Sequence, residues 1–425
     1  MDVVTAFLHP EIDQTDVLMN LPEFHGLGDL SEFNLNRYQI ITVRLRKALY
    51  GLKQSPRLWY KEIDSFLKSL GFRQSIAEPN LYLTETIMIL LYVDDLQLFF
   101  NSRKEVEEIK KKLKEKYRMV DLGPARRFLG MNIDTTESGY ALFQTSYIES
   151  LLRRFGMTDA YGVDTPIDTH VSLDIAANDT DKPTDQTEYL AIVGSLMYAA
   201  IGTRPDISYA VGLLSSYNAN PRTRHLTAAK RVLRYLKKTK DLKLVYTEPG
   251  KGSHGLHGFV DPDWEKSQDR KSIGGYVFML GNAAISPSSK RQTLVALSTK
   301  EAEYTAFTEA SREALWLRQL LSDINNRRNQ PDSEPSAAGA IGTIIYADNQ
   351  GAIKHANTEG ITARTKHFDI YLKHARDLQQ KGIVQFTYIK SADNTADIFT
   401  KGLPLPSHLQ HAKNLGLSKL WVNVG

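Results

Sequence analysis

Two adjacent acids, Asp94 and Asp95, lie between two apolar runs and are well placed in this chain to do chemistry. The runs Ile87–Val93 and Leu96–Phe100 are rich in branched and aromatic residues, which is typical of β-strands. Asp is disfavoured inside strands and common at turns, so the pair is predicted at the tip of a hairpin. The acids could simply form the turn. They could instead bind metal, because a two-metal phosphoryl-transfer site needs carboxylates that converge on ions ~3.5–4 Å apart.

A third carboxylate is needed for such a site, because neighbouring residues on a strand point to opposite faces of the sheet. Asp2 is the candidate, since it lies in the apolar, strand-like run Met1–Leu8. An unpaired charge in such a run is costly unless it is exposed or coordinates something. A solvated chain end is the alternative, and the residues alone leave both interpretations open.

Glu303 heads the inward face of a long predicted helix, Thr299–Asp323. The apolar residues that follow it at steps of three and four are Ala306, Ala310, Ala314, Leu317 and Leu321. A carboxylate on such a face must be paired, protonated or metal-bound, unless the nearby helix end lets it reach water. Asp348 follows the predicted strand Thr343–Ala347. It could cap the helix that begins at Asn349, or it could be a ligand.

The composition bounds the class of protein. The 425 residues suit two or three domains, and 42% hydrophobic residues are enough for real cores. The net charge of +4 and the pI of about 8.8 permit a nucleic-acid partner without demanding one. The absence of cysteine excludes disulfides, cysteine–zinc sites and thiol catalysis. No apolar run reaches the ~18 residues of a membrane span, and no signal peptide is visible, so we expect an intracellular protein without a membrane partner.

A segment rich in basic and aromatic residues, 43–60, could contact nucleic acid. Gly51 and Pro56 punctuate it, and Pro56 can open an amphipathic helix that runs to about Leu70. Basic side chains interleaved with rings suit phosphate contact and base stacking, although a solvated basic face is the alternative. These residues are Arg44, Arg46, Lys47, Tyr50, Lys53, Arg57, Trp59 and Tyr60. A second predicted helix, 225–240, is also basic, and duplex contact and a solvated face stay equally open for it.

Three strings, MDVVTAFL, LYGLKQSPRLWY and ILLYVDDLQLFF, occur in the order and approximate spacing of the reverse transcriptase of copia-type LTR retrotransposons, which the chain resembles. FLGMNI and the segments 193–212 and 225–237 resemble the downstream part of the same polymerase region. The resemblance implies that Asp2, Asp94 and Asp95 are catalytic, metal-binding acids. The other residues expected to act are nucleotide-binding Phe7, Tyr50, Gly51 and Lys53, and nucleic-acid-binding Arg57, Trp59, Phe128, Gly130 and Met131. Phe7 stands where the family's aromatic residue excludes a ribose 2′-hydroxyl.

A second set of strings, FVDPDW, ALSTKEAEY, YADNQGAI, ARTKHFDI and ADIFTKGLP, resembles the RNase H domain of the same polyproteins, in the same order. The resemblance implies that the acids on a strand, a helix, a strand end and a second helix are the catalytic metal ligands. These acids are Asp261, Glu303, Asp348 and Asp397. In that fold they converge at one edge of a mixed sheet. The implied chemistry is hydrolysis of the RNA strand of an RNA–DNA hybrid with two Mg²⁺ ions per site, or Mn²⁺ in their place.

The expected fold is a multidomain α+β and α/β chain. We expect a palm-type antiparallel sheet with helices and incomplete fingers in 1–160, a thumb or connection region in 161–250, an RNase H-like mixed α/β domain in 251–405, and a C-terminal tail in 406–425. Since the chain opens at the first catalytic Asp, we expect the palm sheet to lack strands and Asp2 to lie at a frayed end.

The predicted function is RNA-directed DNA polymerisation with RNase H activity. The implied partners are an RNA template, a DNA primer, the RNA–DNA hybrid and dNTPs, with protease and integrase as other parts of the polyprotein. The implied location is the cytoplasm, in virus-like particles, or the nucleus. The alternative is a truncated retroelement remnant with RNase H only, or with nucleic-acid binding only. Acids at every matched position favour the enzyme, and the expected loss of the fingers favours the remnant.

Overall fold

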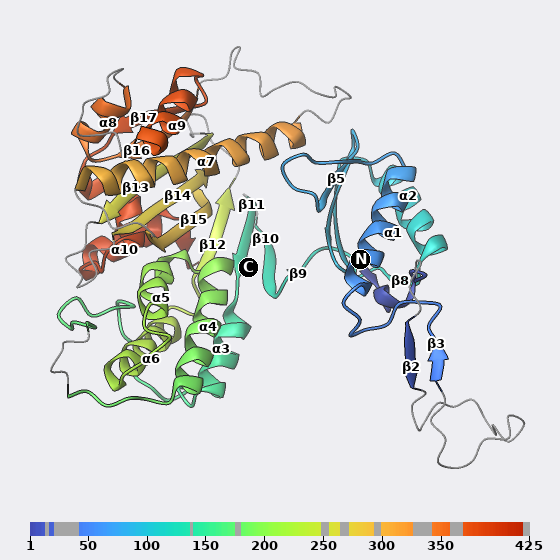
Figure 1. Cartoon of the computed structure of the whole chain (residues 1–425), viewed down its shortest axis with the longest axis horizontal. Coiled ribbons are helices and arrows are strands. Elements are labelled where there is room, and N and C mark those ends of the chain that lie inside the picture. Colours follow the sequence, from blue (N-terminus) through green and yellow to red (C-terminus); the bar gives the residue numbers. More distant parts are fainter. Residues whose placement is uncertain are drawn as a thin grey trace, which may run out of the picture. The chain divides into compact units, whose positions relative to one another are not determined.

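The computed structural model describes residues 1–12, 17–20, 42–136, 139–174, 180–247, 255–263, 272–292, 299–325, 342–357 and 369–419. The chain forms two compact units (Figure 1), one of Met1–Ala125 with Gln319–Asp332 and one of Arg126–Arg318 with Ser333–Gly425. Within the described ranges, no helix is both long and apolar enough to cross a membrane.

The first unit is built on a six-stranded antiparallel sheet with the order β4-β5-β6-β7-β1-β8. Its strands are β1 (Asp2–Val3), β4 (Arg73–Gln74), β5 (Leu81–Leu83), β6 (Ile87–Tyr92), β7 (Asp95–Phe100) and β8 (Met119–Val120). Alternate residues of β6 are buried, and the helices α1 (Ser55–Ser69) and α2 (Arg103–Lys116) contribute apolar side chains to the same core. A 3₁₀ helix, η1 (Ala6–Leu8), follows β1, and β2 (Leu18–Asn20) pairs with β3 (Thr42–Arg44).

The predicted hairpin around the acidic pair is confirmed. Tyr92 and Asp95 are the last paired residues of β6 and β7, so Val93 and Asp94 form the turn. The expectation that Asp2 lies at a frayed end is wrong. Its strand, β1, lies between β7 and β8, and Asp2 pairs with Asp95 on one side and Val120 on the other. The partner strand β8 comes from a segment far along the chain, which no local pattern around Asp2 indicates.

The second unit begins with a five-stranded antiparallel sheet and a group of helices. The sheet order is β18-β12-β11-β10-β9, made of β9 (Arg127–Phe128), β10 (Met131–Thr136), β11 (Gly139–Phe143), β12 (Lys243–Thr247) and β18 (Leu417–Ser418). The helices are α3 (Thr145–Arg154), α4 (Gln186–Gly202), η3 (Pro205–Ile207), α5 (Ser208–Ser215) and α6 (Thr223–Lys238). Tyr189, Leu196, Val232 and Leu236 lie in their shared core.

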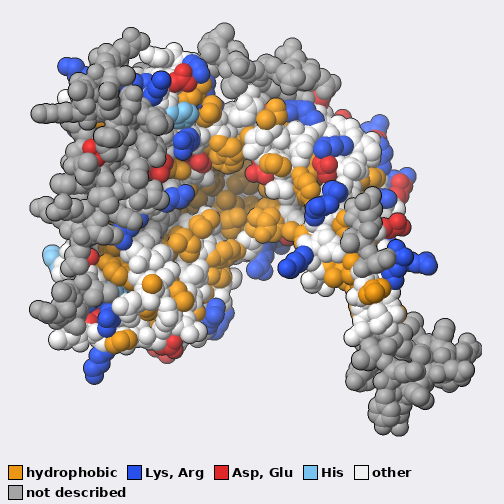
Figure 2. Space-filling model, viewed as in Figure 1, with side chains coloured by type: hydrophobic (Ala, Val, Ile, Leu, Met, Phe, Trp, Pro, Cys, Tyr) orange, Lys and Arg blue, Asp and Glu red, His pale blue; other side chains and the backbone are white. Residues whose placement is uncertain are grey.

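The basic side chains of α6 are paired with other parts of the second unit. The pairs are Lys230 with Glu188, Arg231 with Asp168 and Lys238 with Asp164, while Arg234 and Lys237 donate to the carbonyl oxygens of Tyr161 and Ala160. On the face shown in Figure 2, basic side chains over α5 and α6 are scattered rather than gathered in one patch. These contacts join α6 to α4 and to the segment before α4.

A second, mixed sheet in the same unit has the order β15-β14-β13-β16-β17. Its strands are β13 (Leu256–Asp263), β14 (Ile273–Leu280), β15 (Ala283–Arg291), β16 (Thr343–Ala347) and β17 (Val384–Tyr388); β13, β14 and β15 are antiparallel, and β13, β16 and β17 are parallel. The accompanying helices are α7 (Thr299–Asn325), α8 (Gln350–Asn357), α9 (Asp369–Gln380), η4 (Ser391–Asp393), η5 (Thr395–Phe399) and α10 (Leu405–Asn414). The predicted combination of an antiparallel sheet and a later mixed sheet is confirmed.

Candidate active sites

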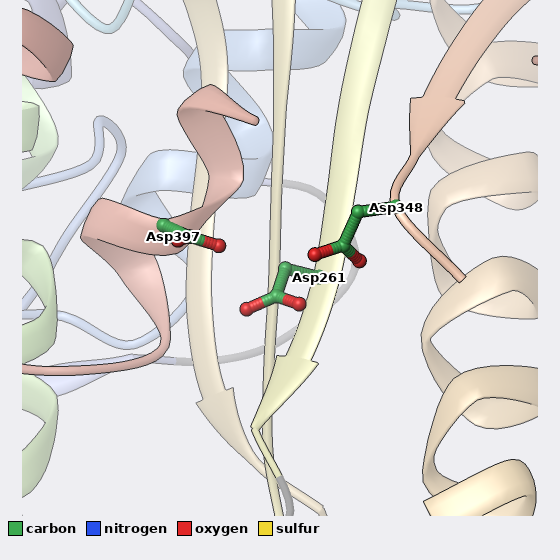
Figure 3. Close-up of side chains that lie close together, drawn as sticks. All are labelled: Asp261, Asp348 and Asp397. Atoms are coloured by element: carbon green, nitrogen blue, oxygen red, sulfur yellow. The ribbon is translucent and has the colours of Figure 1, made fainter. Parts of the chain in front are cut away.

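Three carboxylates meet at one edge of the mixed sheet. Asp261 lies on β13, Asp348 follows β16 directly, and Asp397 lies on η5. Because β13 and β16 are parallel neighbours, their carboxyl ends share an edge, which brings Asp261 next to Asp348. One carboxylate oxygen from each of the three residues lies within 4.8 Å of the other two. Figure 3 shows the three side chains pointing toward a common space from the three elements.

Glu303 is the fourth predicted acid, and it lines the same site from α7. Its side chain is buried, with 5% exposed, so escape to water is excluded. The amide of Asn349 donates to Glu303 Oε1 at 2.9 Å. A cavity of about 440 Å³ is lined by Asp261, Glu303, Asp348, Asn349, Gln350 and Tyr388. Asp261 and Asp348 thus face both Glu303 and Asp397.

The cap of α8 is made by Asn349, whose Oδ1 accepts from the amide of Ala352 at 3.0 Å. Asp348 accepts a hydrogen bond from the hydroxyl of Ser391 instead. The capping alternative for Asp348 is therefore not what the structure shows. This carboxylate is left at the edge of the site.

The segment that carries Asp397 forms two short 3₁₀ helices, η4 and η5, and the helix predicted to carry Asp397 is the second of them. The extended backbone of Asn394 separates them, and its side chain caps η5 by accepting from the amide of Ala396. The same side chain donates to the carbonyl of Val260 on β13 at 3.2 Å. The hydroxyl of Thr400 donates to Asp261 Oδ2 at 2.5 Å. These bonds fix Asp397 beside Asp261.

Gly275 makes room for this segment on the neighbouring strand, β14. A Cβ at position 275 would lie 2.6 Å from Thr400 Cγ2 and 2.8 Å from Phe399 Cβ. We expect Gly275→Ala to lower the free energy of unfolding by about 1–3 kcal/mol, as overpacked cores do, and to displace Asp397 from Asp261. Urea denaturation of the purified chain measures the first effect, and hybrid cleavage measures the second.

The matched control for this variant is Gly255→Ala, because a Cβ at position 255 meets nothing within 4 Å. It should unfold and cleave as the unaltered chain does. If Gly275→Ala were as stable and as active as the control, the close approach at Gly275 would not position Asp397.

Burial makes the ionised forms of these acids costly. It raises the pKa of Glu303 to about 8. It also raises the pKa of Asp397 to about 7, with a further rise from the nearby Asp261, opposed by Lys401. Asp397 Oδ1 is buried and has no hydrogen-bond partner in the part of the chain that the structure describes. Crowded carboxylates with a free oxygen fit a hard divalent cation such as Mg²⁺, which prefers oxygen ligands.

The raised pKa of Glu303 predicts a pH-dependent stability for the metal-free chain. An unfolded Glu titrates near 4.5 and the folded one near 8, so the folded state holds the proton more tightly. The contribution of this group is fully present below about pH 4.5 and is lost as the pH rises through about 8. In EDTA, the free energy of unfolding of Glu303→Gln relative to that of the unaltered chain should therefore be higher at pH 9 than at pH 5. The expected difference between the two pH values is about 2–4 kcal/mol.

Urea denaturation at the two pH values measures this difference, and Glu301→Gln on the same helix is the control. Asp397 and Asp261 also have raised pKa values, so Glu303→Gln should reduce the pH dependence without removing it. An equal stability change at both pH values would contradict the prediction.

The turn of the first hairpin holds the acids of the first unit. Val93 has a φ of 54°, which is unusual for a β-branched residue. The indole of Trp59 donates to the carbonyl of Val93 at 2.6 Å, and the amide of Val3 donates to the carbonyl of Asp94 at 2.9 Å. Burial raises the pKa of Asp95, and the charges of Asp94 and Asp2 add to this effect. The turn is therefore fixed by α1 and β1. The carboxylates of Asp2, Asp94 and Asp95 lie close enough to affect one another.

Trp59 requires a correction, because the sequence placed it among the nucleic-acid contacts. Its side chain is only 1% exposed, and the ring packs in the core with Tyr117 at a centroid distance of 5.2 Å. An amphipathic helix was predicted correctly here, but the face on which Trp59 lies was not. The residue supports the hairpin turn instead of stacking on bases.

The predicted nucleotide-binding residues of the first unit lie partly together. The rings of Phe7 and Tyr50 have their centroids 4.9 Å apart. Gly51 has a φ of 96°, a conformation that favours glycine. Lys53 and Arg57 are exposed, as phosphate contacts would need to be.

Three of the predicted nucleic-acid-binding residues, Phe128, Gly130 and Met131, lie on the tight hairpin between β9 and β10. Phe128 and Met131 are paired across it, and Leu129 and Gly130 form its turn with φ angles of 46° and 75°. The hydroxyl of Tyr198 on α4 donates to the carbonyl of Leu129 at 2.6 Å. A Cβ on Gly130 would lie 2.0 Å from this hydroxyl, so the contact requires glycine.

Several residues that hold these sites were not identified from the sequence. They are Asn349, Asn394, Thr400, Lys401 and Tyr198. Thr400 and Lys401 stand within the string ADIFTKGLP, but a Thr or a Lys there has no spacing signal of its own. Trp264 of FVDPDW, residues 363–368 of ARTKHFDI and residues 420–425 of the expected tail lie outside the described residues.

Comparison with known proteins places these features in context. Residues 1–169 match the protein family described as reverse transcriptase (RNA-dependent DNA polymerase). The chain is 35% identical over 416 residues to the retrovirus-related Pol polyprotein from transposon TNT 1-94 of Nicotiana tabacum, covering 95% of this chain and 30% of that protein. It is 36% identical over 328 residues to the putative transposon Ty5-1 protein of Saccharomyces cerevisiae, covering 74% of this chain and 100% of that protein.

Among solved structures, the foamy viral protease-reverse transcriptase in complex with RNA/DNA hybrid is similar at a TM-score of 0.48 and 15% identity. The match covers 92% of the present chain and 43% of the viral chain. The present chain spans about 30% of the length of the plant Pol polyprotein that it matches.

Proposed function

This chain belongs to the reverse transcriptase family of copia-type retrotransposon Pol polyproteins, and from that premise we propose that it copies RNA into DNA and hydrolyses the RNA of RNA–DNA hybrids. The observation that carries the proposal is the convergence of Asp261, Asp348 and Asp397 within 4.8 Å, with Glu303 in the adjoining cavity. Four carboxylates from four separate elements suit phosphoryl transfer with two metal ions.

For hydrolysis, Asp261, Glu303, Asp348 and Asp397 would hold two Mg²⁺ ions, which when bound activate water and stabilise the leaving oxygen. Thr400 orients Asp261 through its hydrogen bond to Oδ2, and Asn349 orients Glu303 through Oε1. Asn349, Gln350 and Tyr388 line the cavity and can contact the backbone of the hybrid. Recognition by backbone shape and 2′-hydroxyl groups requires no particular base sequence.

For polymerisation, Asp2, Asp94 and Asp95 would hold the catalytic ions, Mg²⁺ or Mn²⁺, near the primer end. The bonded turn at Val93 fixes the direction of Asp94. Phe7 beside Tyr50 offers a ring against the sugar of the incoming dNTP, and Lys53 and Arg57 supply charge for phosphates. The hairpin at Phe128–Met131 would position the primer on the RNA template. The protease and integrase of the polyprotein are proposed partners.

Two assays on the purified chain test the proposal. One follows a 5′-labelled RNA in an RNA–DNA hybrid, and the other follows extension of a DNA primer on an RNA template, both with Mg²⁺ and the second with dNTPs. Cleavage and extension are both expected. Cleavage without extension would support the RNase H-only alternative, and the absence of both would contradict the proposal.

A further inference from the structure

A lysine already occupies part of the acidic site in the second unit. Lys401 Nζ lies 3.0 Å from Asp397 Oδ2 and 3.7 Å from Asp261 Oδ2. Both carboxylates are buried, whereas the side chain of Lys401 is 38% exposed. The ammonium group therefore lies at the mouth of the site, in contact with two of the proposed metal ligands and with a route to solvent.

The main chain around Lys401 is held in place by a hydrogen bond and by close packing. The amide of Lys401 donates to the carbonyl of Asp397 at 3.2 Å. The next residue, Gly402, is packed so closely that a Cβ would lie 2.9 Å from Ile167 Cγ2. Lys carries a compact charge on a flexible four-carbon stem, so its ammonium can leave the carboxylates while the backbone stays fixed.

The position of this charge opposes the binding of a divalent ion at the same carboxylates. A cation next to Asp397 and Asp261 compensates part of their charge when no metal is bound. It also repels an incoming ion across a few ångströms. An ion that binds Asp397 must share this carboxylate with Lys401 or displace the ammonium group of Lys401.

We propose that Lys401 is a resident counter-cation that lowers the affinity of the ribonuclease H site for one of its two divalent ions. This inference rests on the proposed function of that site. In the hybrid-free protein the ammonium holds Asp397 and Asp261 together and keeps the site from loading metal tightly. When the scissile phosphate enters, its negative charge offers the ammonium another partner, and the ion can bind. Lys401 thereby couples metal loading to the presence of substrate.

The test measures Mn²⁺ binding directly, by electron paramagnetic resonance of the free ion, on the full chain without nucleic acid. All variants carry Asp94→Asn, which weakens binding at the polymerase acids. Lys401→Met should bind Mn²⁺ about tenfold more tightly than the parent, because a repelling charge is removed. Lys401→Arg keeps the charge and should bind as the parent does.

Lys381→Met is the matched control, because Lys381 also pairs with an Asp four residues earlier, Asp377, at 2.8 Å on the surface. It should leave Mn²⁺ affinity unchanged. Unchanged or weaker binding in Lys401→Met, or equal tightening in Lys381→Met, would overturn the inference. If Lys401→Met fails to fold, by circular dichroism, Lys401→Gln takes its place with the same expected tightening.

Asp348→Asn separates failure of this inference from failure of the proposed function. Mn²⁺ binding that depends on Asp348, together with hybrid cleavage by the unaltered chain, supports the site itself. An unchanged affinity in Lys401→Met would then reject only the role of Lys401. Without any Asp348-dependent binding or cleavage, the proposed function fails and this inference fails with it.

Discussion

Asp261→Asn is expected to reduce cleavage of an RNA–DNA hybrid by about a thousandfold or more, while primer extension by the same chain stays unchanged. Asp261, like Asp348, faces both Glu303 and Asp397, so its charge serves both sides of the site. An amide has nearly the same shape but cannot carry that charge. Loss of one preorganised electrostatic group in an active site costs about 10²–10³ in rate, and loss of a carboxylate that would hold a catalytic metal ion should cost more.

The measurement is the initial rate of cleavage of a labelled RNA strand at saturating Mg²⁺. Asp393→Asn is the control, because Asp393 is exposed on η4, close in sequence to Asp397. It should cleave at the rate of the unaltered chain. Thermal unfolding should show that Asp261→Asn is folded, and in EDTA more stable, since a buried charge has been removed. Cleavage by Asp261→Asn at the control rate would remove Asp261 from the site.

The sequence predicted best those acids that interrupt the apolar pattern of the strand or helix in which they lie. Asp94 interrupts two apolar runs, so the hairpin turn could be placed to within one residue: it is made by Val93 and Asp94, and Asp95 begins β7. Glu303 heads an apolar stripe, so its burial could be expected, and the structure confirms it. In both cases the side chain conflicts with the element that carries it. Such a conflict is visible along the chain because periodicity defines which face is buried.

The predictions that failed concern contacts between distant segments. Asp2 lies inside a sheet because β8 pairs with it, and nothing near Asp2 indicates that partner. Trp59 could be placed on an amphipathic helix, but its hydrogen bond to Val93 depends on how that helix packs on the hairpin. Lys401 follows Asp397 by one helical turn, a spacing that is common on exposed helices and therefore uninformative. The position of the Lys401 ammonium in the acidic site is apparent only from its contact with Asp261, which is 140 residues away in the chain.

Asp94→Asn is expected to reduce primer extension by about a thousandfold or more and to leave hybrid cleavage intact. Asp94 lies at the tip of the hairpin, where the carbonyls of Val93 and Asp94 are both hydrogen-bonded, so its carboxylate is presented from a fixed backbone. The amide keeps the turn, because Asn is as favourable as Asp there. It loses the charge that two-metal transfer requires.

Extension of a labelled primer on an RNA template measures this effect, and Glu85→Gln is the control, since Glu85 is exposed in the turn between β5 and β6. Extension by Asp94→Asn at the rate of Glu85→Gln would exclude Asp94 from the chemistry. The two catalytic variants also test each other. If the polymerase and ribonuclease sites are independent, Asp94→Asn and Asp261→Asn should each remove one activity and spare the other. A folded variant that removed both activities would contradict the assignment of Asp94 to extension and of Asp261 to cleavage.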